Sequence, residues 1–265
     1  MEAGVANQRL QTRRKRGKRL KRIASAKARA LVWNTGPIPA AIFGAEVYGF
    51  SDADQRILEQ ATTQQRGGGK GKWSTMFSCV FDDASWKAAV APIIEWSRRV
   101  WSTLLVADCS GQGSLTQLMS WWRRSRGCLP NTWGAVRGPL GAAELSMQRI
   151  GWTWTSPLTW TDHEGIERTF TQSSPAMVQS IARKAYLVKK ETEAARQRGL
   201  EEGSLDFSVA RKLLLGSKLP VLEQGCLRSF LARSVWTRAR LANVGLCQTS
   251  ACKHCGKLDT LEHIL

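Results

Sequence analysis

The chain lacks long apolar runs, and this absence excludes whole classes of protein. No uninterrupted apolar stretch approaches the roughly 18 residues that a transmembrane helix needs. The basic residues near the N-terminus are not followed by an apolar segment, so no secretory signal is predicted. We therefore expect neither a membrane-spanning nor a secreted protein.

Acidic residues are also scarce. There are 21 Asp and Glu against 39 Lys and Arg, which gives a formal charge of +18 and a pI of about 10.2. This surplus exceeds what solubility requires and gives the surface a potential that attracts polyanions. RNA or DNA is the expected partner, and an anionic membrane surface is the second candidate. With 265 residues and 43% hydrophobic content, the chain can bury a core in one or two domains.

The cysteines do not follow a disulfide framework. Their number, seven, is odd, and four of them are scattered without regular spacing. These four are Cys79, Cys109, Cys128 and Cys226. A reducing compartment is the simpler prediction.

Two other cysteines and a histidine near the C-terminal end have the spacing of metal ligands. Cys252 and Cys255 are two residues apart and Gly256 follows directly, so both thiolates can reach one ion from a tight turn. His263, eight positions after Cys255, can close the site from a short helix. The pattern predicts zinc bound by Cys252, Cys255 and His263.

This predicted zinc site is one ligand short, because a structural zinc ion takes four ligands. We expect the fourth to lie beyond Leu265, so that the chain ends inside its own metal site. Cys247 or a water molecule is the alternative fourth ligand, although the separation between Cys247 and Cys252 is longer than in a CxxC pair and constrains the two thiols less. A CxxC beside a His also occurs by chance, but the apolar stripe Leu261, Ile264 and Leu265 favours a pinned ligand.

Basic residues are concentrated near the N-terminus. Between Arg9 and Arg29 there are eleven Lys or Arg and no acid. Small and apolar residues follow at helical spacing (Ala24, Ala28, Leu31 and Val32), which predicts a helix with a basic face that ends before Gly36. Such a face suits a phosphate backbone, whereas a solvated leader or a nuclear import signal is the alternative. The expected nucleic-acid-binding residues are Arg13, Arg14, Lys15, Arg16, Lys18, Arg19, Lys21, Arg22, Lys27 and Arg29.

The next segment predicts a proline turn, a short helix of small residues, and a loop capped by Ser51 and Asp52 that opens another helix near Asp54. The stretch from Leu31 to Asp54 resembles the thumb region of jockey-like non-LTR retrotransposon reverse transcriptases, through its run Gly36-Pro-Ile-Pro-Ala-Ala-Ile-Phe-Gly-Ala-Glu-Val-Tyr-Gly49. That region has a "GxxPAxxYGAEVxG"-like segment after a basic helix. Here Phe43 stands where a Tyr often precedes the central glycine.

A second resemblance to the same family lies at the other end of the chain. The run from Cys226 to Leu241 and the following knuckle resemble the C-terminal helix and zinc knuckle of these proteins. In the family, the tail after Leu-Glu-His-Ile-Leu continues to a Cys or His. The resemblance implies a nuclear or ribonucleoprotein-associated fragment of an RNA-directed DNA polymerase, whose magnesium ions belong only to the parent polymerase. An independent nuclear scaffold domesticated from such an element, or a degraded reading frame, is the alternative.

One acidic pair imitates a polymerase active site. Phe81-Asp82-Asp83 imitates the aromatic-x-Asp-Asp signature of polymerase palms, in which paired carboxylates hold two magnesium ions. The pair follows the thumb-like segment, whereas a palm precedes its thumb, and a helix N-cap explains either Asp better. We expect no catalytic residue and no enzymatic activity in this chain.

Periodicity predicts a mainly α-helical fold with one small antiparallel β-hairpin in a Trp-rich middle. Helices are expected over 83–105, 115–124, 175–198, 205–215 and 222–242, and a hairpin over 151–170 with its turn at 162–165. The expected domains are 1–64 (basic helix and thumb-like region), 65–72 (Gly/Lys loop), 73–204 (Trp-rich linker domain), 205–246 (C-terminal helices) and 247–265 (truncated zinc knuckle).

Overall fold

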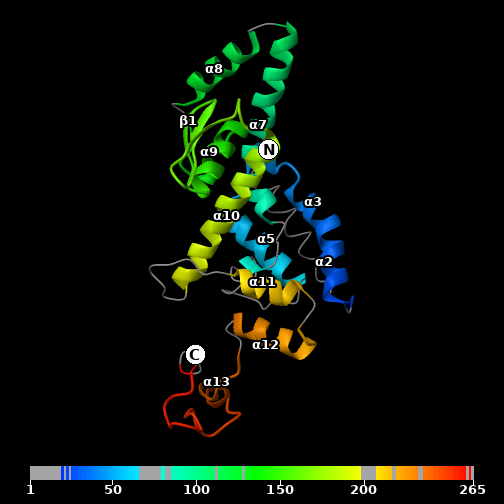
Figure 1. Ribbon diagram of the computed structural model, residues 1–265, viewed down its shortest axis with the longest axis vertical. Coiled ribbons are helices and arrows are strands. Elements are labelled where there is room, and N and C mark those ends of the chain that lie inside the picture. Colours follow the sequence, from blue (N-terminus) through cyan, green and yellow to red (C-terminus); the bar gives the residue numbers. More distant parts are fainter. Residues whose placement is uncertain are drawn as a thin grey trace.

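The fold is mainly helical with one small antiparallel sheet, as predicted (Figure 1). The computed structural model describes residues 19–20, 22–23, 25–65, 79–80, 85–110, 113–126, 129–197, 207–216, 219–231, 235–260 and 263. Figure 1 shows the elements along one long axis, with the sheet and α8 at one end and α13 at the other. No described helix combines the length and hydropathy needed to cross a bilayer.

Residues 26–65 form four helices, one more than predicted, because the expected short helix of small residues is divided in two at Phe43 and Gly44. They are α2 (Ala26–Thr35), α3 (Pro37–Ile42), α4 (Ala45–Tyr48) and α5 (Asp52–Gln65). The chain turns at Arg22 and Ile23, and Ser25 caps α2 by accepting a hydrogen bond from the Ala28 N–H at 3.3 Å. A break therefore separates α2 from the basic block that precedes it.

The buried face of α2 differs from the prediction. Leu31 and Val32, which the spacing placed on the apolar face, are 65% and 41% exposed, whereas Trp33 is buried. The Trp33 indole N–H donates to the Thr62 hydroxyl of α5 at 3.1 Å. The indole ring of Trp33 is buried and its N–H is hydrogen-bonded, which fixes the rotation of α2 about its axis. The smaller side chains of Leu31 and Val32 therefore face outward.

Ser51 caps α5, as predicted, and the capping bond gives a first testable prediction. The Ser51 hydroxyl accepts from the Asp54 N–H at 3.1 Å and donates to the Asp54 carboxylate at 2.7 Å. Ser51→Ala should lower the free energy of unfolding by about 1 kcal/mol, measured by urea denaturation. Ser180→Ala, at an exposed position inside a helix, is the control and should change little. Equal effects of the two substitutions would contradict a capping role.

The largest core lies among α7 (Ser85–Ser110), α8 (Gly113–Arg126), α9 (Pro139–Arg149), the sheet and α10 (Pro175–Gln197). The spacing of seven apolar residues predicts a buried face for α7, and six of them are buried whereas Trp101 is only half-buried. The six are Trp86, Val90, Ile93, Ile94, Trp96 and Val100. Arg98 and Arg99 lie on the exposed side, also as predicted. The short helix η1 (Trp133–Ala135) precedes α9, and neither was predicted.

The sheet is a three-stranded antiparallel meander, one strand larger than the predicted hairpin. Its strands β1 (Thr153–Ser156), β2 (Thr159–Thr161) and β3 (Glu167–Thr169) pair in chain order. Trp154 faces Trp160 across β1 and β2, and Trp160 packs against Phe170 with a centroid distance of 4.2 Å. The predicted turn at 162–165 is present. The buried Asp162 carboxylate holds it by accepting from the Arg168 guanidinium at 2.6 Å.

The C-terminal helices are α11 (Ser208–Leu215), α12 (Val221–Leu231) and α13 (Arg238–Asn243). The prediction of one helix from Leu222 to Ala242 is therefore wrong. Thr237 is extended and caps α13 by accepting from the Arg240 N–H at 3.3 Å, which ends any continuity with α12. Leu214 and Leu231 pack with Ala194 of α10, so α11 and α12 share a small core with the end of that helix.

Candidate metal centre and polar network

The candidate metal site is built on a tight turn. An isolated antiparallel bridge pairs Ala251 with Leu258, and the Cys252 N–H donates to the Lys257 carbonyl at 2.6 Å. Within this loop the Gly256 N–H returns to the Cys252 carbonyl at 3.0 Å. Gly256 has a φ of 72°, a left-handed conformation that a side chain would strain, which explains a glycine directly after the second cysteine.

The turn brings the three predicted ligands together. Ligand atoms of Cys252, Cys255 and His263 all lie within 4.8 Å of one another, and Cys255 Sγ is 3.2 Å from His263 Nε2. Metal–sulfur and metal–nitrogen bonds of zinc in a tetrahedron place S and N about 3.5 Å apart. The donor set and its spacing therefore fit a metal ion. Within the described ranges, this is the one group of three or more Cys, His, Asp or Glu side chains with that geometry.

Local hydrogen bonds favour the thiolate that a metal requires. The His254 backbone N–H, donating to Cys252 Sγ at 3.5 Å, is the largest influence, followed by the side chain of His263. Together with the Cys255 amide they lower the pKa of the Cys252 thiol to about 6. A thiol with this pKa is mostly ionised at neutral pH, the form that binds metals.

Cys247 lies outside this three-residue group. Its thiol donates instead to the carbonyls of Arg238 at 3.4 Å and Thr249 at 3.2 Å. In this arrangement the thiol contributes to the contact between α13 and the following loop. The described candidate ligands are thus Cys252, Cys255 and His263. The apolar residues predicted beside His263, at 261, 264 and 265, lie outside the described residues.

Polar contacts attach the metal-binding turn to α13. The Asp259 carboxylate accepts from the Arg238 N–H at 2.8 Å, and the Asp259 carbonyl accepts from the Ala239 N–H at 3.3 Å. The Arg238 guanidinium also donates to the Thr249 hydroxyl at 3.0 Å. Among the described residues, no buried apolar cluster extends past Leu231. The turn is therefore held mainly by hydrogen bonds in the part that the structure describes.

Most of the predicted phosphate-binding residues lie outside the described residues, including all those from 13 to 18 and Lys21. Arg19 and Arg22 are described and exposed, and Lys27 is in α2, where its side chain is outside the description. Arg29 instead makes internal hydrogen bonds. Its guanidinium donates to the carbonyls of Ile23 at 2.7 Å and Gln65 at 3.4 Å. Because its guanidinium is used inside the protein, we no longer propose Arg29 as a phosphate-binding residue. The pair Asp82 and Asp83 also lies outside the described residues.

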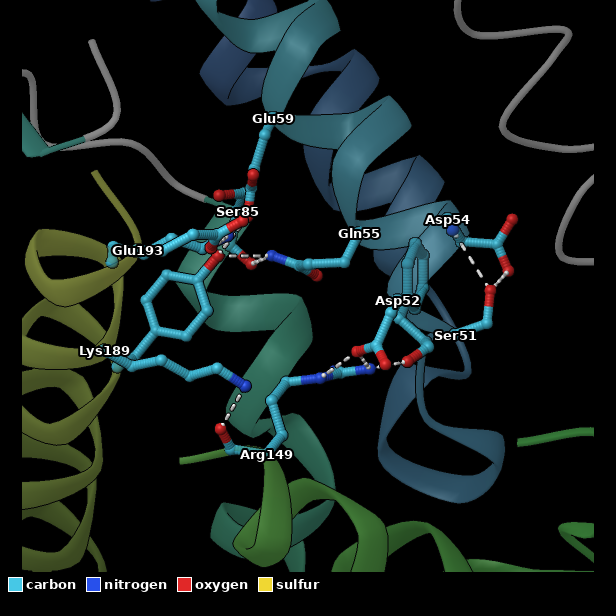
Figure 2. A network of polar contacts seen from close by, with 12 residues as sticks. Ser51, Asp52, Asp54, Gln55, Glu59, Ser85, Arg149, Lys189 and Glu193 are labelled. Carbon is cyan, nitrogen blue, oxygen red and sulfur yellow. Dashed lines mark hydrogen bonds and ion pairs between the residues drawn. The ribbon is translucent and has the colours of Figure 1, made fainter. Parts of the chain in front are cut away.

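A buried polar network that no sequence pattern predicts joins α5, α9 and α10 (Figure 2). Lys190 forms ion pairs with Glu59 at 2.8 Å and Glu193 at 3.1 Å, and both Lys190 and Glu59 are buried. The Tyr186 hydroxyl donates to the same Glu59 carboxylate at 2.5 Å. Glu59 is more than a hundred positions from both Tyr186 and Lys190, so no local spacing could identify these contacts.

The second half of the network is centred on Arg149, at the end of α9. Its guanidinium pairs with Asp52 at 2.9 Å and donates to the Phe50 carbonyl. Burial lowers the pKa of Arg149, and the charge of Asp52 opposes that shift. The Trp133 ring covers the guanidinium at 4.3 Å, and a Cβ at Gly49 would lie 2.2 Å from that ring. The last glycine of the thumb-like segment therefore leaves room for the ring over Arg149.

No protein-family model, curated protein or solved structure matches this chain.

Proposed function

We propose that this chain is a nucleic-acid-binding fragment of a non-LTR retrotransposon reverse transcriptase. In this proposal it lies downstream of the palm, lacks catalytic residues, and grips a template–primer duplex or RNA without reading its sequence. The observation that carries the proposal is the Cys252, Cys255 and His263 group on a glycine turn, within a chain of charge +18. Its place of action would be the nucleus or a cytoplasmic ribonucleoprotein.

Zinc is the metal proposed for this group, because two thiolates and an imidazole form a donor set that zinc prefers. A bound zinc ion would supply folding free energy to the turn. Cys252 and Cys255 would hold it from the turn, and His263 would hold it from the segment that follows. The Thr260 hydroxyl accepts from the His263 N–H at 3.3 Å and so helps to position that segment.

The surface around the turn suits an unpaired nucleic-acid strand. Lys253 and Lys257 are exposed on the turn itself, and Trp236, which directly precedes the N-cap of α13, is 64% exposed. Lysines contact phosphates without sequence preference, and an exposed indole offers a face on which a base can stack. These groups support contacts with RNA or with unpaired DNA at the C-terminal end.

Salt dependence tests the proposed role of the basic N-terminal segment. Affinity for duplex DNA should fall steeply with salt, with log K losing about 0.9 per phosphate contact for each tenfold rise in salt concentration. Replacing Arg13, Arg14, Lys15 and Arg16 with Ala should flatten this slope, as measured by fluorescence anisotropy. The control replaces Arg98, Arg99, Arg123 and Arg124, which removes the same charge from α7 and α8. An unchanged slope in the first variant would favour a solvated leader or an import signal.

Exposed apolar side chains favour a second candidate, a protein-binding scaffold. Val209 and Leu215 of α11 are 62% and 52% exposed, and Val221 and Leu222 of α12 are 87% and 79% exposed. Such residues are typical of interaction surfaces when they gather on neighbouring elements. A folded chain without salt-dependent affinity for RNA or DNA would support this candidate over the first.

A further inference from the structure

A polar cavity of about 390 Å³ lies between α5, the end of α9 and α10. It is lined by five cationic side chains and only two carboxylates. The cations are Arg56, Arg149, Lys189, Lys190 and Arg196, and the carboxylates are Asp52 and Glu193. Its volume is that of a small-molecule site rather than a packing defect.

The two carboxylates are already used by two of the cations. Asp52 pairs with Arg149, and Glu193 pairs with Lys190, which also holds the buried Glu59. Figure 2 shows Arg149 reaching toward Asp52, while Lys189 extends from α10 toward Arg149. Held by Asp52, the Phe50 carbonyl and the Trp133 ring, Arg149 is a fixed positive group in the wall of the cavity.

The other three cations, Arg56, Lys189 and Arg196, form no ion pair with any carboxylate in the part of the chain that the structure describes. The Lys189 ammonium donates to the Arg149 backbone carbonyl at 2.6 Å, which satisfies one donor but does not balance its charge. Burial lowers the pKa of Lys189; the charge of Asp52 opposes this, and the charges of Arg149 and Lys190 add to it. The positive charge of Lys189 is therefore under-compensated, and an anion beside it would relieve that cost.

We propose that this cavity binds a phosphate group, held by Lys189 with Arg56 and Arg196. Guanidinium groups pair with phosphate through two parallel hydrogen bonds, and an ammonium adds a point charge from a third direction. Arg56 comes from α5, whereas Lys189 and Arg196 come from α10, so the donors approach from two walls. The phosphate belongs either to a nucleic-acid backbone or to a free phosphate compound. In the first case the site deepens the proposed function and rests on it.

Isothermal titration calorimetry of the full chain with inorganic phosphate tests whether the cavity binds a free phosphate compound. Arg56→Gln with Arg196→Gln should weaken binding about tenfold, and Lys189→Gln alone should also weaken it. The matched control is Arg123→Gln with Arg124→Gln, which removes the same charge from exposed positions on α8 and should leave the affinity unchanged. The single Lys189 variant keeps the test valid if the double variant folds poorly.

Binding of a single-stranded oligonucleotide tests the backbone source. Each lost phosphate contact should reduce the slope of log K against log salt concentration by about 0.7. The cavity variants should therefore show a flatter slope than the control variant. The inference is overturned if, with folding intact by circular dichroism, the cavity and control variants agree in both titrations. The same experiment measures the affinity of the wild-type chain for the oligonucleotide. If the wild-type chain does not bind it, the proposed function is contradicted, whereas the site for free phosphate is tested separately by the phosphate titration.

Discussion

Cys252→Ser is expected to weaken zinc binding by about a hundredfold or more. Structural zinc sites provide roughly 10–16 kcal/mol of apparent binding free energy, so one ligand of several carries on the order of 3 kcal/mol. The group of Cys252, Cys255 and His263 predicts that His263→Asn has a similar effect. Zinc content after dialysis and competition with a chromophoric chelator measure the affinity, and cobalt substitution shows whether the geometry is tetrahedral.

Cys247→Ser is the matched control for this experiment. Its thiol donates to two backbone carbonyls and stands outside the three-ligand group, so the variant should keep wild-type zinc affinity. Loss of zinc in this variant would instead make Cys247 the fourth ligand. Removal of zinc by a chelator should leave the helices up to Leu231 folded, because their buried clusters include no described residue of the metal-binding turn.

Lys190→Met should destabilise the protein by about 3–5 kcal/mol. The substitution leaves the Glu59 carboxylate buried without its cation, and an uncompensated buried charge is costly. Burial alone lowers the pKa of Lys190, but attraction to Glu59 outweighs it and the pKa is raised above its model-compound value of 10.5. The pair therefore contributes fully below that pH, and the contribution is lost as pH rises through the folded-state pKa.

Lys184→Met tests whether burial, rather than loss of any ion pair, causes this effect. Lys184 is on the same helix and pairs with Glu164 at 2.7 Å, but both side chains are largely exposed. Because solvent screens this pair, its loss should change the free energy of unfolding far less than Lys190→Met does. Replacing Glu59 by Leu together with Lys190→Met should recover much of the lost stability, because both charges of the buried pair are then absent. Equal denaturation midpoints for the two lysine variants would contradict this account.

The sequence predicted those parts of the fold that depend on neighbouring residues. Ser51 before Asp54 predicts a cap, and the spacing of Trp86, Val90 and Ile93 predicts a buried face; both are present. The three metal-site residues were also found together, because the reach of a CxxC turn is set by its own backbone. Short-range geometry is encoded in short-range sequence, so these inferences need no knowledge of the rest of the molecule.

Prediction failed where distant residues decide the outcome. α9 was missed because its small residues give little helical periodicity, although it ends in Arg149 at the polar network. The rotation of α2 depends on Trp33 meeting Thr62, and the Lys190–Glu59 pair joins helices far apart in sequence. A charged residue looks like a surface residue until its partner is known, so the buried network could not be predicted from composition.

The exposure of Trp236 makes it an optical reporter of the C-terminal end. Nine described tryptophans upstream are buried or half-buried, whereas Trp236 and, to a lesser degree, Trp121 face water. A water-exposed indole emits at longer wavelength and is accessible to iodide, so the difference between wild type and Trp236→Phe isolates its emission. That difference spectrum would follow events beside α13 without an attached dye.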